Sequence, residues 1–168
     1  MRSLVRILLP LALLGGLTAC SHYHMGAPGN PVAQTVFVAP ATNSSFAPQA
    51  GPLVTDAVRL ALARDGRIEL ANTGTAAATL SIRLVHFERD ALAARHDDTA
   101  LARKFAAKLT AEITLVGSDG KTLIDRRSIE VARDVFVDSG LQPTEYQTMP
   151  LLAEALATEI AHALLDTW

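Results

Sequence analysis

The sequence has a single cysteine, Cys20, in 168 residues, which excludes an intramolecular disulfide. Only 5% of the residues are aromatic, and no apolar run reaches the roughly 20 residues that a membrane-spanning helix needs. No charge of one sign dominates either, since the formal net charge is −2. A chain of this composition has no general electrostatic attraction for nucleic acid or anionic lipid. An anionic ligand would have to be bound by a local basic patch.

Residues 1–19 have the pattern of a bacterial lipoprotein signal peptide. Arg2 and Arg6 form a basic start, and a short apolar stretch follows at 8–16. The sequence L-T-A-C at 17–20 then places small residues directly before the cysteine, as in a lipoprotein processing site. We therefore expect cleavage before Cys20, with covalent diacylglycerol on its sulfur and an acyl chain on its amino group. The alternative is an ordinary signal peptide followed by a chance cysteine.

The remaining chain is predicted to be a lipidated tether at 20–33 and one domain at 34–168. Loss of Arg2 and Arg6 leaves 13 basic residues against 17 acidic ones, a net charge of −4. Residue Ser21 is not aspartate, which favours sorting to the outer membrane. His22 and His24 lie beside Cys20, but acylation removes the thiolate, and two histidines in a linker make a poor metal site.

Hydrophobic periodicity predicts four strands, at 35–39, 79–89, 105–116 and 122–137, and two helices, at 53–64 and 148–165. Thr148 is the expected N-cap of the second helix, with Pro150 in its first turn. The stretch 90–102 is a connection between strands or a short helical insertion. The element order β-α-β-β-β-α predicts an α/β (α+β) fold, a two-layer sandwich whose mixed four-stranded sheet is covered on one face by two helices. The other face needs a partner or a polar coat, and Lys108, Thr110 and Glu112 supply part of such a coat.

Two strands are irregular. The alternation in 79–89 slips near Leu84-Val85, which indicates either a β-bulge or a strand end that buries its other face against something else. The last strand is longer than the usual ten or so residues, so we expect a bulge or break near Arg126-Arg127, with Leu123 in the buried phase.

The residues that could carry out chemistry are scattered. The five histidines have no spacing typical of a catalytic triad, and no nucleophile elbow or phosphate-binding glycine loop is present. His96-Asp97-Asp98 are adjacent rather than at metal-ligand spacing. We expect neither an enzyme nor a resident cofactor or metal.

Basic residues are more informative, because they gather around one connection. The cluster near the loop between the second and third strands comprises Arg89, Arg95, Arg103, Lys104 and Lys108. Arg126, Arg127 and Arg133 lie on the fourth strand, which should pair with the third. One interpretation is a strand edge guarded by charge. The other is an anion-binding patch, because arginine binds phosphate through two parallel hydrogen bonds.

At this point the chain resembles the LptE-like lipopolysaccharide-assembly lipoproteins. The resemblance begins at Cys20 with Tyr23-His24 and Gly26, and spans almost the whole mature chain. The segments that carry it further are Val36-Phe37-Val38, Asn43-Ser44-Ser45, Arg64-Asp65-Gly66-Arg67, Leu80-Ser81-Ile82, the turn from Gly117 to Gly120 and the alanine-rich last helix. Two positions depart from the pattern: Ala41 replaces an aromatic residue, and the loop at 138–147 is acidic rather than basic.

The resemblance implies a non-enzymatic protein of the outer membrane, lipid-anchored and facing the periplasm. Such proteins sit within the lumen of an LptD-type β-barrel, help it assemble and contact lipopolysaccharide. The expected partners are therefore this barrel, lipopolysaccharide and the membrane, and not nucleic acid. The lipopolysaccharide-binding candidates are Arg95, Arg103 and Lys104, with Arg89 and Lys108 beside them. The alternatives are an accessory lipoprotein of another envelope secretion or transport complex, and an envelope hydrolase or metal-binding protein.

Overall fold

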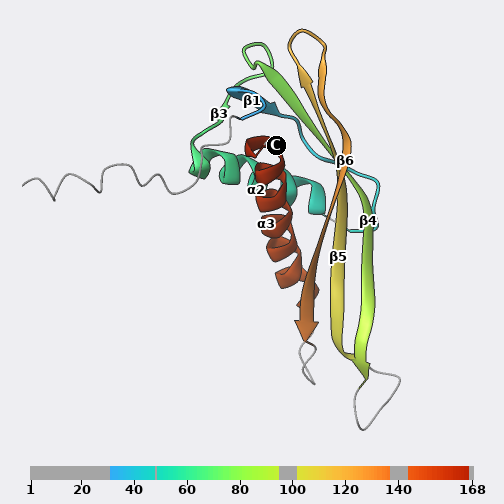
Figure 1. The fold of residues 1–168 in the computed structure, drawn as a ribbon. Coiled ribbons are helices and arrows are strands. Elements are labelled where there is room, and N and C mark those ends of the chain that lie inside the picture. The colour runs from blue at the N-terminus through green and yellow to red at the C-terminus, as the bar shows by residue number, and fades with distance from the viewer. Residues whose placement is uncertain (1–30, 48, 95–101, 137–143, 167–168) are drawn as a thin grey trace, which may run out of the picture.

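The computed structural model describes residues 31–47, 49–94, 102–136 and 144–166. They form two layers, a sheet and a pair of helices that pack against one of its faces (Figure 1). The helices are α2 (Ala50–Asp65) and α3 (Thr144–Leu165). The strands are β1 (Thr35–Val38), β2 (Thr42–Asn43), β3 (Glu69–Leu70), β4 (Ala78–Ala94), β5 (Ala102–Gly117) and β6 (Thr122–Phe136).

The sheet has the strand order β3-β1-β4-β5-β6, and β2 pairs with β4 farther along the edge that β1 occupies. Strand β1 is parallel to β3 and β4, whereas β4, β5 and β6 form an antiparallel meander. The predicted two-layer sandwich with a mixed sheet is therefore confirmed. Its described part holds six strands rather than four, because the two-residue strands β2 and β3 add to those predicted.

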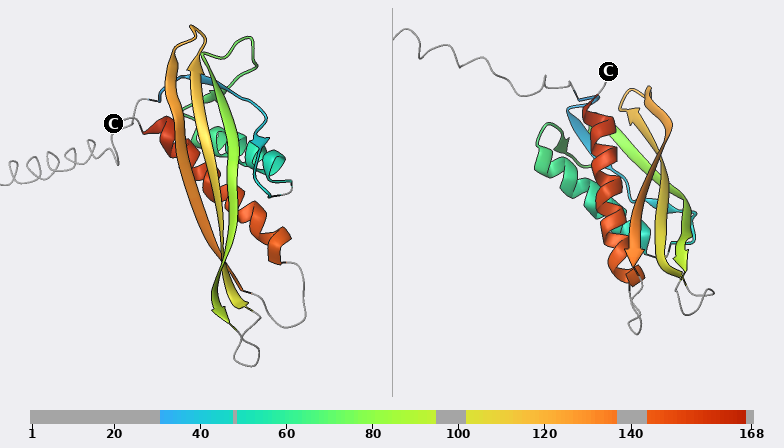
Figure 2. Two further views of the ribbon diagram at one scale, coloured as in Figure 1. Left: turned by 90° about the vertical axis from the view of Figure 1, so that its right-hand side faces the viewer. Right: turned by 60° about the horizontal axis from the view of Figure 1, so that its bottom comes forward.

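The meander runs the length of the molecule, as Figure 2 shows. Strands β1 and β3 pair near the start of β4, whereas Ala94, Ala102 and Phe136 mark the opposite end of the meander, which we call the far end. Residues 90–94 and 102 belong to β4 and β5, so the predicted connection is shorter than 90–102. The core lies between the meander and the helices, and its largest fully buried side chains include Leu80, Ile82, Leu109, Ile113, Leu115, Leu152, Leu156 and Ile160.

Strand β5 shows why the sheet has one buried face. Alternate positions from Ala107 to Leu115 are buried against the helices, while Lys108, Thr110 and Glu112 between them face away. The outward side chains make polar contacts across the strands, including Arg83 with Glu112 at 2.6 Å. The predicted polar coat is therefore present on the open face.

Both strands with an irregular pattern contain a bulge at the predicted place. In β4, Leu84 pairs with Ala111 and His86 with Thr110, so Val85 is the extra residue and the slip is a β-bulge. In β6, Arg126 has a positive φ of 39° at the second bulge. The expected burial of Leu123 is wrong, because the shift brings Ile124 into register with Leu115 and leaves Leu123 36% exposed.

Helix α3 begins earlier than predicted. It starts at Thr144, so Thr148 is a buried residue within the helix rather than its N-cap, and Pro150 lies beyond the first turn. The apolar periodicity of 148–165 predicts the buried face of the helix correctly, since Leu152, Leu156 and Ile160 on it are fully buried. Periodicity fixes the face of a helix better than its first residue.

Helix α2 ends as predicted, with Gly66 at its C-terminus in the left-handed conformation, φ 76°, donating its N–H to the Leu62 carbonyl. Arg59 of α2, which lies off the helix's apolar stripe, does more than face solvent. Its Nη2 donates to the Val38 carbonyl at 2.8 Å, and this bond joins α2 to β1.

Candidate functional site

The structure brings the backbone of the predicted anion-binding residues to the far end of the sheet. Arg103 and Lys104 lie at the start of β5, where Lys104 pairs with Ala93 of β4 and Phe136 of β6, and Arg103 lies at a register shift between β4 and β5. Arg89 lies five residues before the end of β4, and Lys108 lies six residues after the start of β5. Cys20 and Arg95 lie outside the described residues.

Arg89 and Lys108 lie on opposite faces of the sheet. Arg89 pairs with Ala107, which is buried on the helix side, whereas Lys108 pairs with Glu88 on the open face. Successive side chains of a strand point to opposite faces. These two candidates therefore cannot bind the same small anion.

Lys108 is held by acidic neighbours. Its Nζ donates to Asp90 Oδ2 at 2.5 Å. This hydrogen bond raises the pKa of Lys108, with Glu88 and Glu130 adding to the effect, and lowers the pKa of Asp90. A phosphate at Lys108 would have to compete with Asp90 for the ammonium group.

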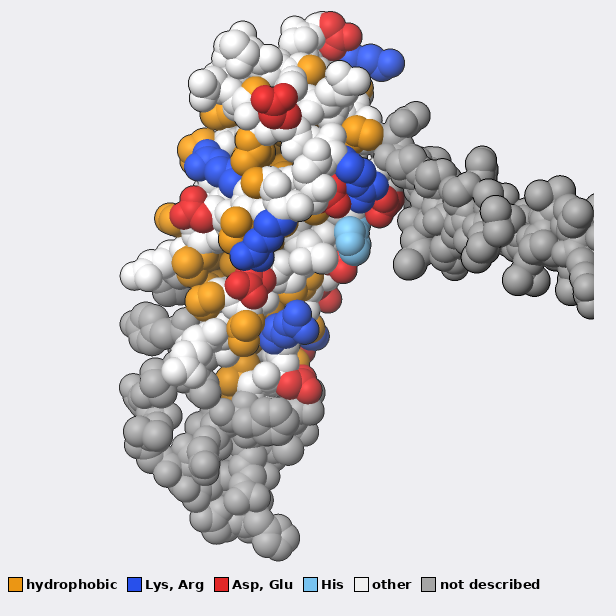
Figure 3. Space-filling model, turned by 90° about the vertical axis from the view of Figure 1, so that its left-hand side faces the viewer, with side chains coloured by type: hydrophobic (Ala, Val, Ile, Leu, Met, Phe, Trp, Pro, Cys, Tyr) orange, Lys and Arg blue, Asp and Glu red, His pale blue; other side chains and the backbone are white. Residues whose placement is uncertain are grey.

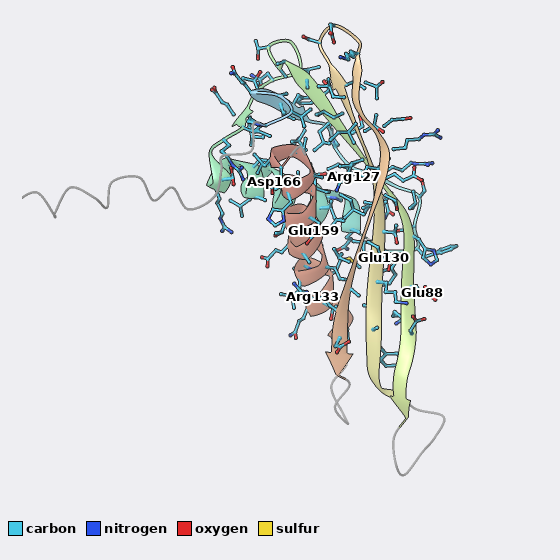
Figure 4. All side chains as sticks on the ribbon, in the orientation of Figure 1. Glu88, Arg127, Glu130, Arg133, Glu159 and Asp166 are labelled. Carbon is cyan, nitrogen blue, oxygen red and sulfur yellow. The ribbon has the colours of Figure 1, made fainter. Side chains whose placement is uncertain are left out.

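The open face of β4, β5 and β6 is acidic rather than basic. Figure 4 shows Glu88 and Glu130 on the side of the sheet away from the helices. By register and alternation, Arg83 and Lys108 share this face with Glu88, Asp90, Glu112, Glu130 and Asp134. Acidic groups therefore outnumber basic ones there, and a strongly anionic ligand is repelled from its centre.

The arginines of β6 lie at the sheet's edge, next to β5 as predicted. Arg127 and Arg133 share the phase of Ile129 and Val131, which pack against the core, so both lie on the helix side (Figure 4). Basic and acidic side chains alternate over that side of the molecule (Figure 3). This distribution fits a charged, guarded edge.

A groove that the sequence analysis did not identify lies between β6 and the C-terminal part of α3. It has a volume of about 420 Å³. Its lining is apolar at Val32, Leu123, Ile124 and Ala163, and polar at Arg127, Glu159, His162 and Asp166. The signal in the sequence was the spacing of Glu159, His162 and Asp166, which places their side chains on one face of a helix. We call this the β6–α3 groove.

Ion pairs lie beside one end of this groove, where Asp166 is part of the lining. Arg67 contacts Asp65 at 2.8 Å and Asp166 at 3.4 Å, which joins the end of α2 to the end of α3. The hydrogen bond from Arg67 lowers the pKa of Asp65 and raises that of Arg67. Nearby, the Val32 N–H donates to the Leu164 carbonyl at 3.0 Å. The first described residues of the chain are therefore bonded to the end of α3.

Among the described ranges, no three histidine, cysteine or carboxylate side chains are grouped as metal ligands. His86 has Glu88 at 3.5 Å on the open face, and His162 lies in the β6–α3 groove. Neither helix of the described chain is long and apolar enough to cross a membrane.

Comparison with solved structures finds the same fold in bacterial proteins of low sequence identity. A minor lipoprotein from Acinetobacter baumannii has a TM-score of 0.52 and 15% identity, over 79% of this chain and 90% of the other. A protein from Xanthomonas campestris has a TM-score of 0.61 and 17% identity, over 83% and 87%. Lipoprotein B from Nitrosomonas europaea has a TM-score of 0.52 and 14% identity, over 83% and 86%.

No curated protein sequence matches the chain. The model of the family described as "LptE: Lipopolysaccharide-assembly" matches residues 33–167, which covers every described helix and strand. The fold and this match agree with the resemblance drawn from the sequence motifs. The chain belongs to the LptE lipopolysaccharide-assembly family.

Proposed function

We propose that this protein is a lipid-anchored component of the outer-membrane lipopolysaccharide translocon. In this role it binds an LptD-type β-barrel, helps the barrel assemble and contacts lipopolysaccharide as it passes. The observation that carries the proposal is the family match over residues 33–167, because it spans the whole folded domain.

The shape of the domain supports this role. The bond between Val32 and Leu164 fixes where the tether enters, beside the end of α3. From Leu84 to Ala94, β4 extends by ten residues, about 33 Å at 3.3 Å per residue, towards the far end. If the domain is anchored at Cys20, its far end can thus contact a partner at a distance from the place where the tether enters the domain.

Lipid anchoring is the first part to test. Mass spectrometry of the membrane-extracted protein should find a diacylglyceryl group and an N-acyl chain on Cys20, since stable anchoring needs more than one chain. The Cys20→Ser variant should be released from membranes. A mature protein that is freely soluble, with an unmodified thiol, would contradict the proposal.

The partner is tested by extraction in mild detergent. A tagged chain should bring down a large outer-membrane β-barrel in a stoichiometric complex, and depletion of the chain should lower the amount of assembled barrel. Recovery of a different envelope machine, with no barrel, would instead identify an accessory lipoprotein of another transport complex.

Lipopolysaccharide contact is predicted to depend on the basic residues near the far end. Replacement of Arg95, Arg103 and Lys104 by serine should weaken lipopolysaccharide binding, and the loss should shrink as salt is raised because salt screens exposed charges. The matched control removes three cations elsewhere, Arg64, Arg83 and Lys121. Equal binding by the two triple variants across a salt series would exclude this contact.

A further inference from the structure

We propose that the β6–α3 groove is the docking site for this chain's own tether, with Tyr23 and Met25 covering its apolar floor. The groove is preformed within the domain, and its floor contains Leu123 and Ile124. Leu123 lines the groove and is 36% exposed, because the register shifts in β6 leave it out of the buried phase. A groove of about 420 Å³ lies near the lower end of the size range of ligand pockets, about 300–1,000 Å³, and can hold a few side chains.

The position of the chain selects this occupant. Val32 lines the groove and is fixed to Leu164, so residue 31 and the segment before it start at the groove's rim. Tyr23 is nine residues from Val32, and a flexible linker of that length has a root-mean-square span of about 15–18 Å. A short linker of this kind gives an effective concentration in the millimolar range. Even if the segment's own affinity for the groove is weak, the linkage within one chain is then enough to keep it bound there.

The chemistry of the segment also fits. Residues 21–31 read S-H-Y-H-M-G-A-P-G-N-P and contain no lysine, arginine, aspartate or glutamate. The groove's charged lining is Arg127 with Glu159 and Asp166, a net charge of −1 with His162 neutral. Imidazole N–H groups of His22 and His24 can donate to these carboxylates, while the tyrosine ring and the methionine thioether suit an irregular apolar floor.

Docking would set the distance between the domain and its anchor, a consequence that rests on the proposed lipidation of Cys20. With residues 20–32 extended, the domain could stand about 40 Å from the lipid. With Tyr23 in the groove, three residues remain, or about 10 Å. The edge of the sheet at β6 and the end of α3 would then lie against the membrane.

The test places a photoreactive p-benzoyl-phenylalanine at position 23 of the full, membrane-extracted chain. Irradiation should join residue 23 to the tryptic peptide 122–126, which contains Leu123 and Ile124, within one chain. A second change, Leu123→Ser, should lower the yield of this product by roughly tenfold, because it removes the apolar contact. Leu60→Ser on α2, also at an exposed leucine (49%), should leave the yield unchanged.

The same experiment on the Cys20→Ser chain separates docking from lipidation, and the product should form there as well. Products spread over many surface peptides, products joining two copies or another protein, or a yield unaffected by Leu123→Ser would each overturn the proposal.

Discussion

The central leucine of β5 offers the sharpest test of the fold. Leu109 is fully buried, and its neighbours in register are Phe87 on β4 and Val131 on β6, both packed into the core. Leu109→Ala removes about three methylene equivalents, worth about 2.4 kcal/mol of transfer free energy at about 0.8 kcal/mol each. The cavity left behind raises the expected loss to about 3–5 kcal/mol, because strands on both sides restrict collapse.

This loss is a large share of the stability of a typical domain, about 5–15 kcal/mol. The loss should be measured by urea unfolding followed by far-ultraviolet circular dichroism. The slope of the free energy of unfolding against urea concentration should be the same as for the unchanged protein. The control is Thr110→Ala, the next residue, whose side chain lies on the open face. A loss below about 1 kcal/mol for Leu109→Ala, or one equal to the control's, would refute the assignment of the two faces of β5.

Three further outcomes follow from single positions. Gly66→Ala should destabilise the protein by about 1 kcal/mol in thermal unfolding, because its φ of 76° disfavours a Cβ, whereas Gly74→Ala, which meets no neighbouring atom and has no positive φ, should not. Arg126→Gly should raise the free energy of unfolding by about 0.5 kcal/mol by relieving its φ of 39°, and Arg126→Ala should give no such gain. The lowered pKa of Asp65 stabilises the fold above the ordinary carboxyl value of 3.8, and this contribution is lost as pH falls through the lowered value. In Arg67→Gln, the free energy of unfolding should therefore fall less steeply with pH over this acidic range, as measured by denaturant unfolding at a series of pH values. An unchanged slope against pH would disprove the effect of Arg67 on Asp65.

Local alternation predicted the meander well, because each strand buries one face against the helices. In β5 the alternation from Ala107 to Leu115 matches the buried positions without exception. The phase slip near Val85 left two interpretations open, and the structure has the β-bulge, in which an extra residue exchanges the two faces of the strand.

Features that depend on pairing between strands far apart in the sequence were not predicted. The two-residue strands β2 and β3 carry too few residues for any periodicity, and they form because β4 and β1 offer free edges. Leu123 was misplaced because its side depends on the register between β6 and β5. For the β6–α3 groove, the sequence shows only that Glu159, His162 and Asp166 share a helix face, because the groove itself arises where the edge strand and the last helix pack together.

The placement of the basic candidate residues could be predicted only in part. Sequence proximity grouped Arg89 and Lys108, but pairing of β4 with β5 puts them on opposite faces. The carboxylates that raise the pKa of Lys108 come from β4 and β6, so their effect depends on the assembled sheet.

The hydrogen bond between Val32 and Leu164 has a consequence for biogenesis. The chain is made from its N-terminus, yet Val32 can form this bond only once the end of α3 has been made. Truncation within the last turn of α3 that removes Leu164 would therefore leave the start of the described domain without its bond to the last helix.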